Sequence, residues 1–165
     1  MNIKRIFKHL FTTDSQVRRA FPRSALETIE QTIKASEELH RCEIRFAVEG
    51  SLDGIPLFNG QSPRERAIAV FSQLQIWDTE HNNGLLIYLL LADRAVEIVA
   101  DRGINAKIDL ETWVHICQQM EKAFSQSNFE GGVISAIQAV TQHLINYFPV
   151  HGPSRNDLSN KPVVL

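Results

Sequence analysis

Apolar residues at the start of the chain recur with the spacing of one helical face. They fall at positions i, i+3, i+4, i+7 and i+8, and they are Ile3, Ile6, Phe7, Leu10 and Phe11. Basic residues take the other side, so we expect a basic amphipathic helix over residues 1–20. Its apolar face has two alternatives: it packs on the protein or a second copy, or it lies on an anionic membrane surface.

Three later segments have the patterns of strands. Residues 42–48 alternate apolar and polar side chains, which predicts a strand with one face less buried. Residues 85–92 are apolar on both faces, which is typical of a central strand covered on both sides. After a tight turn at Asp93-Arg94, residues 95–100 are expected to pair back as a hairpin.

Helical periodicity fills the intervals between these strands. Ser24 with Glu27, and Ser62 with Glu65, have the spacing of a capping box at a helix start. Two further helices are expected near 109–126 and 130–147. The order α-β-α-β-β-α-α predicts an α/β fold, a three-layer α/β/α sandwich with a small mixed sheet.

The connections between these elements predict the order of the strands in the sheet. A β-α-β unit is parallel, so strand 85–92 is placed in the centre, with 42–48 and 95–100 on its flanks. We assign residues 21–148 to this domain. Residues 149–165 hold three of the six prolines and little periodicity, so we expect a flexible C-terminal tail.

The composition indicates which classes of partner and which cellular compartment to expect. Of 165 residues, 44% are hydrophobic and 22% charged, which excludes a disordered or fibrous chain. A net charge of −2 and a pI of about 6.3 argue against nucleic acid as a partner. The longest apolar run has eight residues, too short to cross a bilayer. Two isolated cysteines fit a reducing compartment, so we expect a cytoplasmic protein without a signal peptide or anchor.

The charge is distributed unevenly along the chain. Residues 1–23 hold six basic side chains and one acidic one, a net charge of +5, so the remainder carries −7. This asymmetry predicts that the first segment has its own partner, either a protein or the surface of a membrane that it meets peripherally.

The expected strand directions sort the polar loops into two ends of the sheet. One end collects Asp93 and Arg94; the other is richer in ligand types and collects Glu43, Asp78, Glu80, Asn83, Asp101 and Arg102. Carboxylate and amide oxygens suit calcium or magnesium, so Asp78, Glu80 and Asp101 are the candidate metal ligands. Arg102 is a candidate phosphate contact. The alternative is that these loop residues are polar only because they meet water.

The run from Asn82 to Ile104, with an Asn-Gly entry, an apolar strand, an Asp-Arg turn and a glycine-bearing exit, resembles the TPM domain family. Phe124 and the segment 129–133 also fit, and the resemblance covers roughly residues 20–148. It implies an α/β/α sandwich. It also carries over five motif positions as candidate binding residues, namely Asn83, Gly84, Asp93, Arg94 and Gly103.

The resemblance also implies what the protein does. Family members are linked to acid phosphatase activity, calcium binding and the repair or modulation of membrane proteins. No nucleophile motif such as GxSxG, and no Walker, HExxH or GxGxxG motif, occurs in the chain. We therefore expect an interaction module in the assembly or quality control of membrane-associated proteins, with calcium or magnesium as the candidate cofactor. The alternative is a metal-dependent phosphatase that hydrolyses phosphomonoesters.

Overall fold

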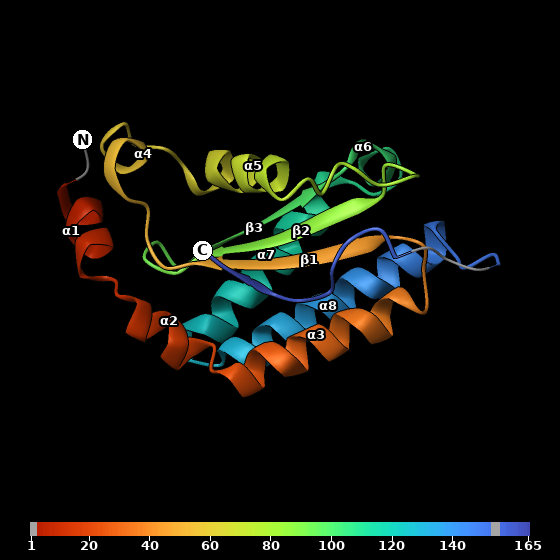
Figure 1. Cartoon of the computed structure of the whole chain (residues 1–165), viewed down its shortest axis with the longest axis horizontal. Helices are drawn as coiled ribbons and strands as arrows, with labels where there is room; N and C mark the ends of the chain where they lie inside the picture. Colours follow the sequence, from red (N-terminus) through yellow and green to blue (C-terminus); the bar gives the residue numbers. More distant parts are fainter. Residues whose placement is uncertain (1–2, 153–155) are drawn as a thin grey trace.

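A four-stranded sheet lies at the centre of the molecule, between two layers of helices (Figure 1). The computed structural model describes residues 3–152 and 156–165. The strands are β1 (Glu43–Glu49), β2 (Gly84–Leu90), β3 (Ala95–Ala100) and β4 (Val163–Val164), in the order β3-β2-β1-β4. Strands β1 and β2 are parallel and β2 and β3 antiparallel, so the predicted mixed sheet and α/β class are confirmed.

The helices cover both faces of this sheet. They are α1 (Ile3–Phe11), α2 (Asp14–Ala20), α3 (Arg23–Glu37), α4 (Gly54–Phe58), α5 (Pro63–Gln73), α6 (Arg102–Asn105), α7 (Leu110–Ser125) and α8 (Phe129–Tyr147). Helices α3, α7 and α8 lie below the sheet in Figure 1, and α4 and α5 lie above it. Helices α1 and α2 run down one end of the molecule.

The period-two pattern of the central strands creates two separate cores. Leu85, Ile87 and Leu89 of β2 face the layer of α3, α7 and α8 and belong to the larger core. Leu86 and Tyr88 face the opposite way and pack with the residues of α5. Because every residue of β2 is buried, the strand is apolar throughout, as expected for a central strand.

A directional chain of hydrogen bonds crosses the larger core. The Cys42 N–H donates to His40 Nδ1 at 3.2 Å, which leaves the proton on Nε2 to donate to Ser36 Oγ at 2.8 Å. The Ser36 hydroxyl then donates to Thr141 Oγ1 at 2.5 Å, and Thr141 donates to the Ile137 carbonyl at 2.6 Å. Burial lowers the pKa of His40 to about 4, so the ring stays neutral. Each hydrogen bond in this series therefore keeps the same donor and acceptor, from Cys42 to Ile137.

Of three local features, two differ from the expectation and one agrees with it. The single helix expected over residues 1–20 is two helices, α1 and α2, separated at Thr12–Thr13; Met1 and Asn2 lie outside the described residues. The capping box at Ser62–Glu65 is confirmed. The one at Ser24–Glu27 is wrong, because α3 begins after Pro22 without a side-chain cap and Glu27 pairs with Arg23 instead.

The C-terminal segment also departs from the flexible tail expected over 149–165. Strand β4 pairs in parallel with the outer edge of β1, through Ala47–Val163 and Val48–Val164. Leu158 packs against the smaller core. Residues 153–155 of this tail lie outside the described residues. The added strand makes β1 an internal strand rather than the predicted flank.

Close backbone approach explains the glycine at the start of β2 and supplies a test. A Cβ built on Gly84 would lie 2.1 Å from the carbonyl oxygen of Ile76, which is backbone and has no flexible end to move. We expect Gly84→Ala to lower the free energy of unfolding by about 3 kcal/mol, measured by urea denaturation.

The matched control is Gly60→Ala. Its Cβ would meet nothing within 4 Å, so only the positive φ of 72° opposes the change. That variant should lose about 1 kcal/mol. Equal losses in the two variants would contradict the steric account of Gly84.

Candidate functional site

The three candidate metal ligands lie at the end of the sheet predicted for them but do not form a cluster. Asp78 and Glu80 are exposed in the loop before β2, and the Glu80 carboxylate is 3.9 Å from His81 Nε2. Asp101 caps α6 by accepting from the Arg102 N–H at 2.7 Å, and its Oδ2 is buried without a partner. The described residues contain no group of three or more His, Cys, Asp or Glu side chains placed to hold a metal. Metal binding by these residues stays a prediction.

The neighbouring motif residues make contacts that shape the loops. Arg102 donates from Nε and Nη2 to Asn82 Oδ1, at 3.2 and 3.0 Å. Gly103 donates its N–H to the Asn82 carbonyl, and a Cβ there would lie 2.4 Å from that oxygen. The buried Asn83 donates from its amide nitrogen to the Arg41 carbonyl. These contacts join the loops before β1, before β2 and after β3.

Glu43 binds the chain's own C-terminal segment. Its carboxylate accepts from the backbone N–H groups of Asp157 and Leu158, each at 3.2 Å. Glu37 lies beside it, accepts from the Ile44 N–H at 2.7 Å and also accepts from the side-chain amide of Asn160. Burial raises the pKa of Glu43, and it raises the pKa of Glu37 to about 7. The pair fastens the segment that leads to β4.

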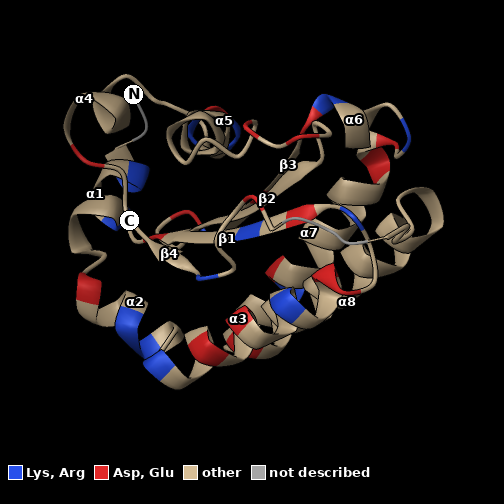
Figure 2. Cartoon of the chain, turned by 45° about the vertical axis from the view of Figure 1, so that its right-hand side comes forward, with Lys and Arg blue, Asp and Glu red and all other residues tan. Residues whose placement is uncertain are grey.

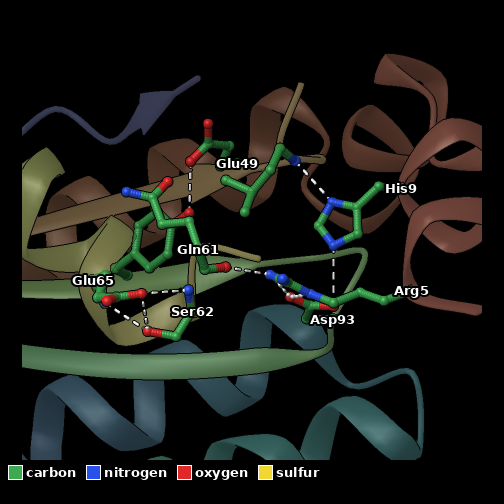
Figure 3. Close-up of polar contacts among 9 residues, drawn as sticks. Arg5, His9, Glu49, Gln61, Ser62, Glu65 and Asp93 are labelled. Atoms are coloured by element: carbon green, nitrogen blue, oxygen red, sulfur yellow. Dashed lines mark hydrogen bonds and ion pairs between the residues drawn. The ribbon is translucent and has the colours of Figure 1, made fainter. Parts of the chain in front are cut away.

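The opposite end of the sheet contains a cluster of polar side chains, which we name the Asp93 clamp: Arg5, His9 and Asp93. Arg5 donates from Nε and Nη2 to the Asp93 carboxylate at 3.0 and 2.8 Å (Figure 3). His9 Nδ1 accepts from the Leu52 N–H at 2.8 Å, so its Nε2 carries the proton and donates to Asp93 Oδ1 at 3.0 Å. Burial alone would raise the pKa of Asp93, but these hydrogen bonds outweigh it and hold the pKa below its ordinary value.

A second polar cluster lies on the upper face of the sheet and was not identified from the sequence. Tyr88 donates to Glu49 Oε2 at 2.5 Å, and Arg66 of α5 contacts both oxygens of the same carboxylate at 2.8 Å. Burial and the neighbouring carboxylate raise the pKa of Tyr88. The available signal was a tyrosine inside an otherwise aliphatic strand, because a buried phenol needs a hydrogen-bond partner.

The Asp93 clamp sets which side of α1 meets solvent. Arg5 and the fully enclosed His9 side chain point inward to Asp93. The opposite side, which we name the outer apolar face, is Ile3, Phe7, Leu10 and Phe11, with exposed fractions of 59%, 54%, 63% and 72%. Helix α1 thus attaches through Arg5 and His9 and through the partly buried Ile6, which packs on the smaller core, and leaves the rest of its apolar side uncovered.

Basic residues surround this face. Lys4 and Lys8 are exposed on α1, and Arg18 and Arg19 are exposed on α2, the helices at one end of Figure 2. None of these four side chains makes an ion pair with a described residue, unlike Arg5 and Arg23. Helix α4, which contacts α1, adds the exposed Ile55 and Phe58. The described chain thus exposes an apolar helix side next to cations that make no ion pair with a described residue.

A family model and a solved structure each match most of this chain. The sequence model of the TPM domain matches residues 17–143. The NMR structure of the BA42 protein from Bizionia argentinensis superimposes with a TM-score of 0.74 at 27% identity, covering 86% of this chain and 93% of that one. No curated protein matches the chain.

Two further solved structures share the fold at lower identity. The N-terminal domain of a protein from P. gingivalis has a TM-score of 0.61 at 21% identity and covers 79% of this chain and 82% of that one. The N-terminal domain of the cg2496 protein from Corynebacterium glutamicum has a TM-score of 0.50 at 15% identity, with 80% and 76% covered. These two likenesses concern the fold alone.

The Asp93 clamp predicts that α1 can be released without unfolding the rest. In Asp93→Ala, Arg5 and His9 lose their shared acceptor, so we expect α1 to open more easily by about 2 kcal/mol, or roughly 30-fold faster amide exchange over residues 3–11. Glu27→Gln, which breaks the exposed pair with Arg23, is the control and should leave this exchange unchanged. Unchanged exchange in Asp93→Ala would show that α1 is held by other contacts.

Glu37 predicts a pH dependence of stability. Its folded pKa of about 7 lies above the ordinary glutamate pKa of 4.5, so its contribution to stability is fully present below pH 4.5 and is lost as pH rises through about 7. From about pH 5 to about pH 8 we expect wild type to lose roughly 2 kcal/mol relative to Glu37→Gln in chemical denaturation. The lowered pKa of His40 makes both proteins less stable as pH falls. This effect is the same in wild type and in Glu37→Gln, so it cancels in the comparison.

The exposed neighbour Glu38 supplies the control. Glu38→Gln should keep the wild-type slope of stability against pH. A slope that is the same in Glu37→Gln as in wild type would remove Glu37 as its source.

Proposed function

The chain belongs to the TPM domain family, and within it we propose that this protein is an interaction module that docks on an anionic membrane surface through α1. At that surface it would serve the assembly or quality control of membrane-associated proteins. The observation that carries the proposal is the outer apolar face, which the Asp93 clamp turns away from the protein.

The orientation of α1 supports this role because it reverses the usual one. A surface helix stabilises a fold by burying its apolar stripe and exposing its charges. Here the charged Arg5 is 18% exposed while Phe11 is 72% exposed. Large uncovered apolar patches mark interaction surfaces, so the outer apolar face supports a role in which a second surface covers it.

Charge favours a bilayer over a second copy of the chain. Two copies joined through α1 would bring Lys4, Lys8, Arg18 and Arg19 of each copy together, and these like charges repel. An anionic leaflet attracts them instead, by about 1 kcal/mol for each cation near its surface. Lysines beside an apolar helical face can keep their stems in the interface and their ammonium groups among the headgroups.

The proposed contact is peripheral. No helix in the described part of the chain has the length and apolar character needed to cross a bilayer. A nine-residue helix with aromatic and aliphatic residues on one side lies in the plane of the interface, with that side at the boundary of the acyl chains.

The alternative, a metal-dependent phosphatase acting on phosphomonoesters, depends on the family resemblance. Its expected ligands are Asp78, Glu80 and Asp101, with calcium or magnesium as cofactor and Arg102 as the phosphate contact. The exposed positions of Asp78 and Glu80, and the Asn82 contacts of Arg102, lend this assignment no support. We therefore favour the docking role.

Vesicle binding tests the proposal directly. We expect wild type to co-sediment with phosphatidylcholine vesicles that contain about one third phosphatidylglycerol, and to bind pure phosphatidylcholine much more weakly. Phe7→Ser/Phe11→Ser should weaken binding at least about tenfold by removing buried apolar area. Lys4→Gln/Lys8→Gln should weaken it in a salt-dependent way.

Matched controls come from exposed leucines elsewhere. Leu39 and Leu110 are 54% and 62% exposed, and neither lies on α1. Leu39→Ser/Leu110→Ser should bind vesicles like wild type. The membrane role would be overturned if wild type did not bind anionic vesicles, or if Leu39→Ser/Leu110→Ser lost as much vesicle binding as Phe7→Ser/Phe11→Ser. The outer apolar face would then be expected to bind a groove on a protein partner.

A further inference from the structure

A cleft of about 900 Å³ opens beside the outer apolar face. It lies beyond the carboxyl end of β2, between the end of α1, helix α2, the β2–β3 turn and the start of α8. In α/β folds this end of the parallel strands is where ligands usually bind. Neither the family match nor the solved structures assign this cleft a ligand.

Three cations from three different elements line the cleft. Lys8 comes from α1, Arg19 from α2 and Arg94 from the β2–β3 turn. All three are exposed, and none makes an ion pair or a side-chain hydrogen bond with a described residue. The one acidic residue in the lining is Glu130, so the cleft carries a positive excess. Convergent, unpaired cations around a cavity favour an anionic ligand.

The start of α8 adds to this positive field. Ser127, Asn128, Phe129 and Glu130 all line the cleft. Helix α8 has 19 residues and its N-cap Asn128 makes no side-chain capping bond, and it is the amino-terminal end of this long helix that lines the cleft. Such N–H groups and the helix dipole favour negative charge.

Apolar side chains make up the rest of the lining. Phe11, Pro22, Leu91 and Phe129 contribute to it, and Phe11 also belongs to the outer apolar face. The cleft therefore adjoins the surface that would rest on a bilayer. A ligand with a phosphate at one end and hydrocarbon at the other matches this arrangement.

We propose that the cleft binds the phosphate of an anionic phospholipid headgroup, through Lys8, Arg19 and Arg94. The assignment rests on the proposed membrane role, because α1 would bring the cleft to the leaflet. A planar guanidinium from Arg19 and another from Arg94 can each contact two phosphate oxygens, while Lys8 supplies a point charge. No bond is broken, and the lipid is held rather than hydrolysed.

The test uses a soluble headgroup fragment and the full-length chain. Glycerol phosphate is titrated while amide NMR shifts are recorded, and we expect saturable shifts at residues 91–94 and 127–130. Arg19→Gln/Arg94→Gln should bind it at least about tenfold more weakly, as expected when two bidentate contacts are lost. Arg18→Gln is the matched control, because Arg18 is exposed on the same helix but does not line the cleft.

Vesicles and inorganic phosphate separate the two sources of phosphate. Arg94→Gln should bind phosphatidylglycerol vesicles more weakly than Arg18→Gln does, because each variant removes one cation but only Arg94 lines the cleft. Inorganic phosphate that produces the same shifts with equal affinity, together with unchanged vesicle binding, would assign the cleft to free phosphate and overturn the lipid assignment.

The remaining outcomes distinguish this inference from the proposed function. If glycerol phosphate gives no saturable shifts but vesicle binding still depends on Phe7 and Phe11, the cleft proposal fails and the membrane role stands. If wild type does not bind anionic vesicles, the membrane role and the lipid assignment fail together, even where glycerol phosphate binds.

Discussion

The contact of Asp93 with Arg5 and His9 is the constraint that orients the whole amino-terminal region. One carboxylate at the β2–β3 turn receives hydrogen bonds from two successive turns of α1, and His9 is in turn fixed by the Leu52 backbone. Without that acceptor, an amphipathic helix would gain by turning its apolar side to the protein. The outer apolar face, the free lysines and one wall of the cleft are all consequences of this attachment.

Local patterns predicted the central part of the fold well. Alternation over 42–48 and the apolar run at 85–92 identified β1 and β2, and the parallel pairing followed from the intervening helix. Strand β4 could not be predicted because it has only two residues and no periodicity to detect. The break between α1 and α2 was missed because apolar spacing says where a face lies, not where the backbone stops being helical.

The candidate site was harder to predict, for a physical reason. The sequence indicates Asp78, Glu80 and Asp101 because topology brings their loops to one end of the sheet, but sharing an end does not make side chains converge. The clamp joins Arg5 to Asp93 across 88 positions, and nothing local to either residue indicates the other. Arg94 was identified through the family motif, whereas its place in a cationic cleft depends on α2 and α8.

The short strand β4 has a consequence for the behaviour of the protein at high concentration. The C-terminal segment occupies the outer edge of β1. Strand β4 pairs with Ala47 and Val48, and the residues before it donate backbone hydrogen bonds to Glu43. An open edge of buried, aliphatic strand is a template on which other chains assemble into aggregates. The two residues of β4 thus protect the edge of β1 from pairing with other molecules. Proteolytic loss of the last few residues would expose that edge and promote aggregation.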